Sequence, residues 1–190
     1  FQQNNSQVSF ISFEDNQVEN NFFLNRNERQ LGDTGNDLKR YGDKIYIVVN
    51  VSSTIEIIDA NTFESIKQIS MITGTTAKQP RSILFHDGLA YVTCFDGYVD
   101  IIDTTSLIIN DRIEVGSNPE DMAIANNKLY VTNSGGLNIP LMDSTVSVID
   151  LNTHQEIGKI IVGMNPGTIK ADQDGDIYVV ARGNYSNIPS

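Results

Sequence analysis

Basic residues, cysteine and long apolar runs are all scarce in this chain. Its 190 residues include 13 Lys or Arg against 24 Asp or Glu, which gives a net charge of −11 and a pI of about 4.4. A surface of this sign repels the phosphates of nucleic acids and of anionic lipids, so we expect no nucleic-acid partner. The acidic surface needs no special ligand, since a net charge away from zero is ordinary for a dispersed protein.

The other absences exclude three further kinds of site. The single cysteine, Cys94, excludes an internal disulfide bond. No apolar stretch approaches the roughly 20 residues that a membrane-spanning helix needs. The two histidines, His86 and His154, have no Ser, Cys or Asp partner at a spacing typical of a catalytic triad or a zinc site. We therefore expect no metal, no cofactor and no enzymatic activity.

What the chain does contain is a repeat. One sequence motif centred on a tyrosine, which we call the repeat phrase, occurs four times, at residues 43–50, 87–94, 127–133 and 176–181. The tyrosines recur at spacings of 45, 39 and 48 residues. A second phrase that ends in Asp follows the first three copies, at residues 54–59, 98–103 and 145–150. A period in the forties, built from short apolar runs and turn residues, predicts an all-β fold: a β-propeller of four-stranded antiparallel blades.

Residues 117–163 show the order of strands within one predicted blade. We name the strands A to D from the channel outward and expect them at residues 121–125, 129–133, 145–151 and 156–162. Pro119 precedes strand A, and because proline disfavours helical backbone in the residue before it, we expect Asn118 to be extended. Asn126 and Asn127 are suited to the tight turn between strands A and B.

The same order divides the chain into three whole blades and two half blades. The boundaries are predicted at residues 1–30 (strands C and D, with D over 18–23), 31–73, 74–116, 117–163 and 164–190 (strands A and B). An open array of this kind would expose strand edges, so we expect the chain to be about half of a longer propeller. The remaining blades of that polypeptide would then be its nearest partner. Alternatively, the two half blades pair and close a four-bladed ring.

Residues Tyr130-Val131-Thr132-Asn133 match the YVTN motif at all four positions, and the chain resembles the YVTN-repeat β-propellers. Residues 31–38, 49–53 and 133–136 resemble more closely the surface lipoproteins of gut Bacteroidetes. This resemblance implies a seven-bladed propeller, exported and lipid-anchored at the cell surface of a Gram-negative outer membrane. Members of that branch include vitamin B12-capturing lipoproteins that sit over a TonB-dependent transporter. The resemblance therefore implies a corrinoid (vitamin B12) ligand and an outer-membrane transporter as partner.

Two of the connections between strands B and C are candidate binding loops. Residues 134–144 form a long connection, and residues 182–189 begin a second one with the same Asn-Ile-Pro phrase. Long loops on a rigid scaffold are common places for binding, although these could equally cover a blade edge. Phe95, Tyr98 and Tyr185 lie in connections of this type and could supply flat apolar surface to a large planar ligand or a sugar.

Charged residues at the starts of successive A strands are the other candidates. They could ring the mouth of the channel and orient a polar ligand, or could simply pair with one another to solvate the channel. The complete set of predicted ligand-binding residues is Asp37, Arg81, Phe95, Asp96, Tyr98, Glu120, Asp121, Asn138, Arg182, Asn184 and Tyr185.

Other acidic residues are better explained by turns. Asp59, Asp103 and Asp150 each close a C strand, where a carboxylate can accept hydrogen bonds from the turn's own backbone. Residues 172–176 have a calcium-like spacing of carboxylates but lack the glutamate and the full loop of an EF-hand. Because a hairpin turn is already required there, we interpret them as a turn.

Three functions remain open from the sequence. The first is a non-enzymatic cell-surface protein that captures a small-molecule nutrient, with corrinoid as the sharpest candidate, and delivers it to a transporter. The second is a structural or protein-interaction propeller of the cell surface. The third, a hydrolase or lyase that uses Glu120 and Asp121, has the least support, because no motif fixes the position of a carboxylate pair.

Overall fold

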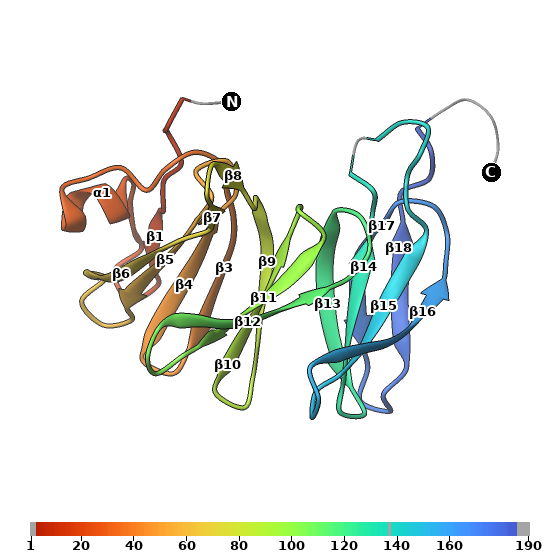
Figure 1. The fold of residues 1–190 in the computed structure, drawn as a ribbon. Helices are drawn as coiled ribbons and strands as arrows, with labels where there is room; N and C mark the ends of the chain where they lie inside the picture. The colour runs from red at the N-terminus through yellow and green to blue at the C-terminus, as the bar shows by residue number, and fades with distance from the viewer. Residues whose placement is uncertain (1–2, 137, 186–190) are drawn as a thin grey trace. The chain divides into compact units, whose positions relative to one another are not determined.

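The computed structural model describes residues 3–136 and 138–185 of the chain. It confirms the predicted fold class, since the described residues form antiparallel sheets, three of which have four strands in sequential order (Figure 1). The chain divides into two compact units, Phe1–Pro80 and Arg81–Ser190. Among the described residues no helix is long and apolar enough to cross a membrane.

The described part of the first unit contains two two-stranded sheets and a four-stranded sheet. Strands β1 (Phe10–Ser12) and β2 (Gln17–Glu19) pair with each other and precede the short helix α1 (Phe22–Asn27). The four-stranded sheet has the order β3 (Gly35–Tyr41), β4 (Lys44–Val49), β5 (Thr54–Asp59) and β6 (Ser65–Ser70). A two-stranded hairpin of β7 (Ile72–Thr73) and β8 (Thr76–Ala77) follows.

One predicted strand of this unit is wrong. Residues 18–23 were expected to form a single D strand, but β2 ends at Glu19 and α1 begins at Phe22. The reason is that Phe22 and Phe23 are adjacent and both buried, with exposed fractions of 3% and 2%. Successive side chains of a strand point to opposite faces, whereas one helical turn lets both rings reach apolar surroundings. Asn21, with φ of 55°, provides the change of direction.

The second unit contains two four-stranded sheets and a two-stranded sheet. The first sheet is built from β9 (Pro80–His86), β10 (Leu89–Cys94), β11 (Tyr98–Asp103) and β12 (Ile108–Glu114). The second has β13 (Pro119–Ala125), β14 (Lys128–Asn133), β15 (Thr145–Asp150) and β16 (Gln155–Ile161). Strands β17 (Pro166–Ala171) and β18 (Ile177–Ala181) form the third sheet. The strands of the second sheet lie where the repeat predicts them.

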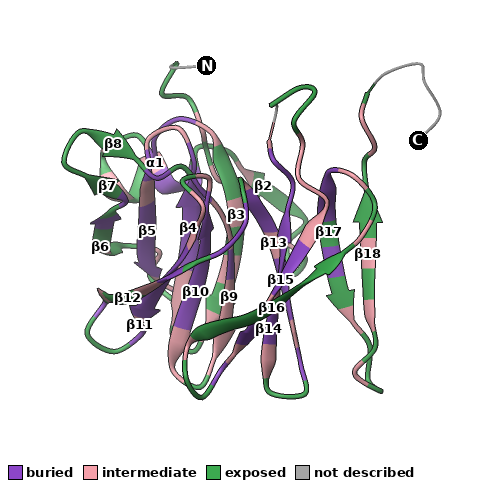
Figure 2. Cartoon of the chain, turned by 45° about the vertical axis from the view of Figure 1, so that its right-hand side comes forward, coloured by how far each residue is buried: buried purple, intermediate pink, exposed green. Residues whose placement is uncertain are grey.

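Apolar side chains between neighbouring sheets form the core of this unit. Tyr91, Val99 and Ile101 of the first sheet pack with Leu129 and Ile149 of the second. On the opposite face of the second sheet, residues such as Ala123 and Val146 pack against Ile169 of the third. In Figure 2 the middle strands are accordingly mostly buried, whereas β16 is exposed along its whole length. Each four-stranded sheet is therefore one blade, with its outermost strand at the surface.

The residue before each strand-A proline differs from the prediction. Gln79, Asn118 and Asn165 have φ of 53°, 47° and 58°, so none is extended. This conformation directs backbone groups toward the connection after strand B. The Asn118 carbonyl accepts a hydrogen bond from the Ser134 amide at 3.2 Å, and the Asn165 carbonyl accepts one from the Arg182 amide at 2.9 Å. These backbone bonds offset the local preference that proline imposes.

Candidate functional site

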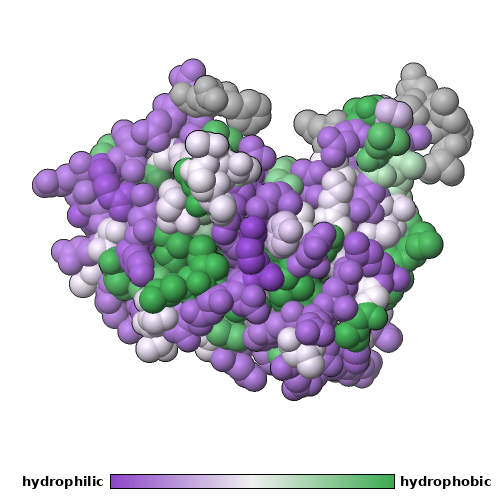
Figure 3. Space-filling view, viewed as in Figure 1, coloured by the Kyte–Doolittle hydropathy of each residue, from purple (hydrophilic) through white to green (hydrophobic). Residues whose placement is uncertain are grey.

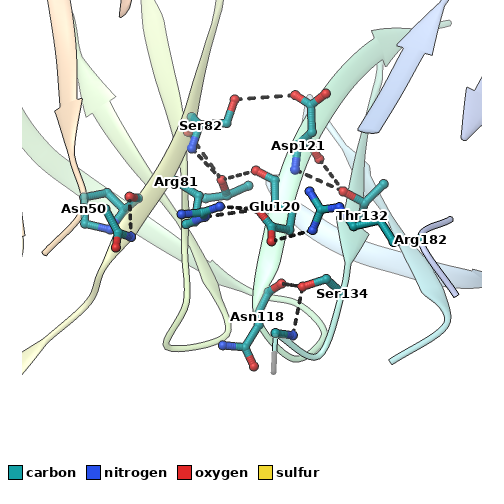
Figure 4. Close-up of polar contacts among 12 residues, drawn as sticks. Asn50, Arg81, Ser82, Asn118, Glu120, Asp121, Thr132, Ser134 and Arg182 are labelled. Atoms are coloured by element: carbon teal, nitrogen blue, oxygen red, sulfur yellow. Dashed lines mark hydrogen bonds and ion pairs between the residues drawn. The ribbon is translucent and has the colours of Figure 1, made fainter. Parts of the chain in front are cut away.

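A cluster of charged residues in the second unit joins three successive sheets. Arg81 is the second residue of β9, Glu120 is the second residue of β13, and Arg182 follows β18 directly. The Nε and Nη2 groups of Arg81 both donate to Oε2 of Glu120 at 3.0 Å. Nη1 of Arg182 donates to the other carboxylate oxygen, Oε1, at 3.1 Å (Figure 4). We call these three residues the arginine clamp.

Burial differs sharply among the members of the arginine clamp. The Glu120 side chain is 9% exposed, while those of Arg81 and Arg182 are 22% and 40% exposed. A buried carboxylate is costly unless it is paired, so Glu120 depends on its guanidinium partners. The clamp therefore presents a cationic surface to solvent, with its negative charge underneath.

Threonines of the repeat phrase hold the backbone of the clamp in place. Thr93, in β10, donates through Oγ1 to the Glu120 carbonyl at 2.8 Å and accepts from the Ser82 amide at 3.0 Å. Thr132, the third residue of the YVTN phrase, bonds both the amide and the carbonyl of Asp121. The first threonine links neighbouring blades and the second links strands A and B of one blade. The start of β13 is thus fixed on both sides.

Asp121 lies beside the clamp but has its own partners. Its Oδ2 accepts from the Ile169 amide at 3.2 Å and from the Lys170 ammonium at 3.0 Å. Its Oδ1 accepts from the Met122 amide at 2.9 Å. Asp121 therefore connects the second and third sheets and neutralises Lys170.

An aromatic ring lies next to Arg81, and two side-chain amides are linked to the residue that carries it. The guanidinium carbon of Arg81 is 4.6 Å from the centroid of the Phe95 ring, a cation–π contact. The Phe95 carbonyl accepts from Nδ2 of Asn118 at 3.4 Å, and Oδ1 of Asn118 accepts from Asn138 at 3.2 Å. Among the predicted site residues, the structure thus brings Phe95 and Asn138 into one contact network with Arg81, Glu120 and Arg182.

Three other predicted residues, Asp96, Tyr98 and Asp37, have partners outside the arginine clamp. Asp96 accepts from Arg112 at 2.7 Å, and the Arg112 guanidinium carbon lies 4.0 Å from the centroid of the Tyr98 ring. Burial alone would lower the pKa of Arg112, but the carboxylates of Asp96 and Asp100 raise it above its ordinary value. Asp37 belongs to the first unit, where it ion-pairs with Lys39 at 3.1 Å.

The second long loop is described only in part. Asn184 is half-buried and Tyr185 is exposed, just beyond Arg182. The rest of the predicted loop, residues 186–189, lies outside the described residues, as does Leu137 of the first loop. The first loop contacts the connection before β13, because the Ser117 amide donates to Oδ2 of Asp143 at 3.1 Å. The connections before strand A and after strand B therefore share one end of this blade.

Sequence reasoning missed several residues that shape the site. Gly167 occupies the position after proline that Arg81 and Glu120 occupy in the preceding blades. A Cβ atom there would lie 2.4 Å from Cζ of Arg182, so the glycine provides the room for that guanidinium. Comparison of the three post-proline positions could have revealed this glycine. Nothing in the repeat marks Lys170 or Asn118 as neighbours of the clamp.

The aspartates that close the C strands act on their own turns. Oδ1 of Asp103 accepts from the amides of Ser106 at 2.6 Å and Thr105 at 3.0 Å. In the same way, Oδ1 of Asp59 and Oδ1 of Asp150 each accept from the backbone amides two and three residues further along the chain. In each case these amide donors hold the pKa of the carboxyl below its ordinary value. Asp172 likewise caps a turn through the amides of Asp174 and Asp176.

Solved structures of several β-propeller proteins share this fold. Virginiamycin B lyase from Staphylococcus aureus has a TM-score of 0.70 at 16% identity, over 90% of this chain and 55% of that one. The WD40 β-propeller domain of Doa1 has a TM-score of 0.67 at 16% identity, over 82% of this chain and 50% of that one. Hydrazine synthase of Kuenenia stuttgartiensis has a TM-score of 0.66 at 18% identity, over 76% of this chain and 40% of that one.

Likeness at these identities establishes the fold and no particular activity. The chain spans between 40% and 55% of the length of these three structures. No curated protein matches the sequence. A family match, in contrast, extends over residues 1–189, nearly the whole chain. The protein therefore belongs to the DUF5074 family, which is described as a domain of unknown function.

Proposed function

We propose that this protein is a non-enzymatic binding protein that captures a small-molecule nutrient at the arginine clamp. The observation that carries the proposal is the clamp itself: two guanidiniums converge from different blades on one buried carboxylate. Polar groups held by a rigid scaffold and flanked by an aromatic ring are typical of small-molecule sites. The ring is Phe95, beside Arg81.

The state of the two central carboxylates supports binding over catalysis. Glu120 accepts from two arginines, and Asp121 accepts from Lys170. Carboxylate oxygens that already accept hydrogen bonds from cationic side chains are occupied by those partners and are poorly placed to exchange a proton with a substrate. We therefore propose that the protein is not an enzyme and that these carboxylates position cations.

A corrinoid is the sharpest candidate ligand, on the basis of the family resemblance. It offers a broad planar face and amide-rich edges, which suit an aromatic ring and a set of N–H donors. The same resemblance supports a place at the cell surface of a Gram-negative outer membrane and transfer of the ligand to a TonB-dependent transporter. These three points form one proposal, and each has its own test.

Titration with cyanocobalamin tests the ligand. The full-length protein should change the visible absorption of cyanocobalamin at a saturable stoichiometry and release or absorb heat on mixing. Arg182→Gln should weaken binding about tenfold, which corresponds to ~1.4 kcal/mol for the loss of one charged hydrogen-bonding group. Arg40→Gln is the matched control, because Arg40 is an exposed arginine of the first unit that donates to the Gly42 carbonyl. Absence of both the spectral change and the heat of mixing would exclude a corrinoid as the ligand.

A protein-interaction role is the second candidate, and strand β16 favours it. All seven residues of this outermost strand are exposed, including Ile157, Ile160 and Ile161 at 55%, 49% and 83%. The face seen in Figure 3 carries several separate hydrophobic patches among hydrophilic residues. Three exposed isoleucines on one edge strand are suited to contact with another protein. Recovery of the same membrane protein by the unliganded chain, lost on changing Ile157 and Ile161 to Ser, would favour this role.

A further inference from the structure

The arginine clamp and its neighbours contain more positive than negative charge. Arg81 and Arg182 share the single carboxylate of Glu120. The nearby Asp121 does not cancel the surplus, because it is already paired with Lys170 at 3.0 Å. Three cations against two carboxylates leave one unit of positive charge here, on a chain whose net charge is −11. At physiological ionic strength charges beyond about 8 Å are largely screened, so the charges nearest the clamp contribute most to the field there.

Stabilising Glu120 does not require both arginines. Arg81 alone donates two hydrogen bonds to Oε2, and its side chain is the more buried of the two guanidiniums. Arg182 adds one bond from Nη1, and among the described residues this is the one contact recorded for its guanidinium group. A guanidinium has five N–H donors, so Arg182 presents further donors on a side chain that is 40% exposed.

The orientation of both guanidiniums is fixed before any ligand arrives. Arg81 is held by Glu120 and by the face of the Phe95 ring. Arg182 is held by Glu120, and its Nε and Nη2 edge occupies the space that the absence of a side chain at Gly167 leaves. Figure 4 shows the two arginines on opposite sides of Glu120. A site whose donors are already positioned loses less side-chain entropy when it binds.

We infer that the arginine clamp binds an oxyanion, a phosphate or carboxylate group carried by the small-molecule ligand. This inference rests on the proposed function for the location of the site and adds the chemical group that is recognised there. Guanidinium groups match the planar geometry of carboxylate and the oxygen spacing of phosphate, and they stay charged at all physiological pH values. Glu120 keeps the two arginines together, and Arg182 supplies the donors that face solvent.

Nuclear magnetic resonance of the full chain with inorganic phosphate and with acetate tests this inference. The arginine Nε–H resonances of Arg81 and Arg182 should shift in a saturable way with at least one of the two anions, and chloride at equal ionic strength should not reproduce the shift. Whichever anion binds more tightly identifies the group. Arg182→Gln should weaken the binding at least tenfold, and Gly167→Ala should weaken it by displacing the Arg182 side chain.

Two controls separate the possible results. Arg40→Gln should bind like the unmodified chain, and thermal unfolding should show that all variants are folded. Equal anion binding by Arg182→Gln and the unmodified chain, or no saturable shift with either anion, would overturn the inference. Failure of the proposed function is distinguishable: if cyanocobalamin binds while both anions fail, the function stands and the oxyanion is wrong. If an anion binds while cyanocobalamin does not, the oxyanion site stands and the corrinoid is wrong.

Discussion

The aspartates at the ends of β5, β11 and β15 show how single residues stabilise this fold. Each accepts hydrogen bonds from two amides of the turn that follows it. The ionised carboxyl is the stronger acceptor of these bonds, so they favour the charged form. Folding and deprotonation of these side chains are therefore linked.

This linkage predicts a pH dependence of stability. The pKa of Asp103 is lowered from 3.8, chiefly by the Ser106 amide, so its contribution is complete above about pH 3.8 and is lost as pH falls through the folded-state pKa. Asp103→Asn should flatten the dependence of the urea midpoint on pH in that acid range. Carboxyl-carbon NMR titration gives the direct check, and an Asp103 pKa at or above 3.8 in the folded protein would contradict the prediction.

In the blade formed by β13 to β16, polar residues of strand B bind the neighbouring strands. Asn133, at the end of β14, donates to Thr145 and Ser147 of β15 and accepts from the Gly116 amide. Its side chain is completely buried. Thr132 meanwhile bonds the start of β13. The last two residues of the YVTN phrase thus join the B strand to strands A and C and to the connection before the blade.

Substitutions at two glycines should distinguish the stabilising role of the buried Asn133 side chain from a general effect of replacing glycine. A Cβ at Gly116 would lie 2.3 Å from Cγ of Asn133, while one at Gly158 would have no neighbour within 4 Å. Gly116→Ala should lower the free energy of unfolding by about 1–3 kcal/mol, because it displaces a buried, hydrogen-bonded amide. Gly158→Ala should leave it unchanged or raise it by a few tenths of a kcal/mol. Equal urea midpoints for the two variants would contradict the assignment.

At the largest scale, the core of the second unit consists of apolar contacts between neighbouring sheets. In the second unit these contacts join β10, β11 and β12 to β13, β14 and β15. Leu129 lies in this layer and is fully buried, whereas Ile161 of β16 is 83% exposed. We therefore expect packing between blades to contribute most of the stability of this unit.

Two truncations to alanine test this view. Leu129→Ala should cost about 2–5 kcal/mol, because it leaves a cavity between two sheets. Ile161→Ala should change stability by less than about 0.5 kcal/mol, because its side chain is already in water. Calorimetric unfolding of both variants measures the difference. Similar melting temperatures for the two would show that the layer between the sheets is not the core.

Some of the candidate site could be predicted from residue positions. Arg81 and Glu120 follow Pro80 and Pro119 in successive repeats, and this placed both at the same end of neighbouring A strands. The contacts of Tyr98 could not be predicted in the same way. Its ring packs under Arg112, a residue of the next strand, and the repeat gives no information on that pairing. Side-chain direction within a connection depends on such neighbours.

The sequence by itself determined the strands, the turns and their order, because the period of apolar residues and the turn residues are local properties. It was wrong where two adjacent phenylalanines had to be buried together and where Asn118 precedes proline. Only the tertiary structure decided that Glu120 joins Arg81, which is 39 residues away, to Arg182, which is 62 residues away. Contacts between sheets depend on how side chains from different blades pack, and a repeat within one blade cannot specify that packing.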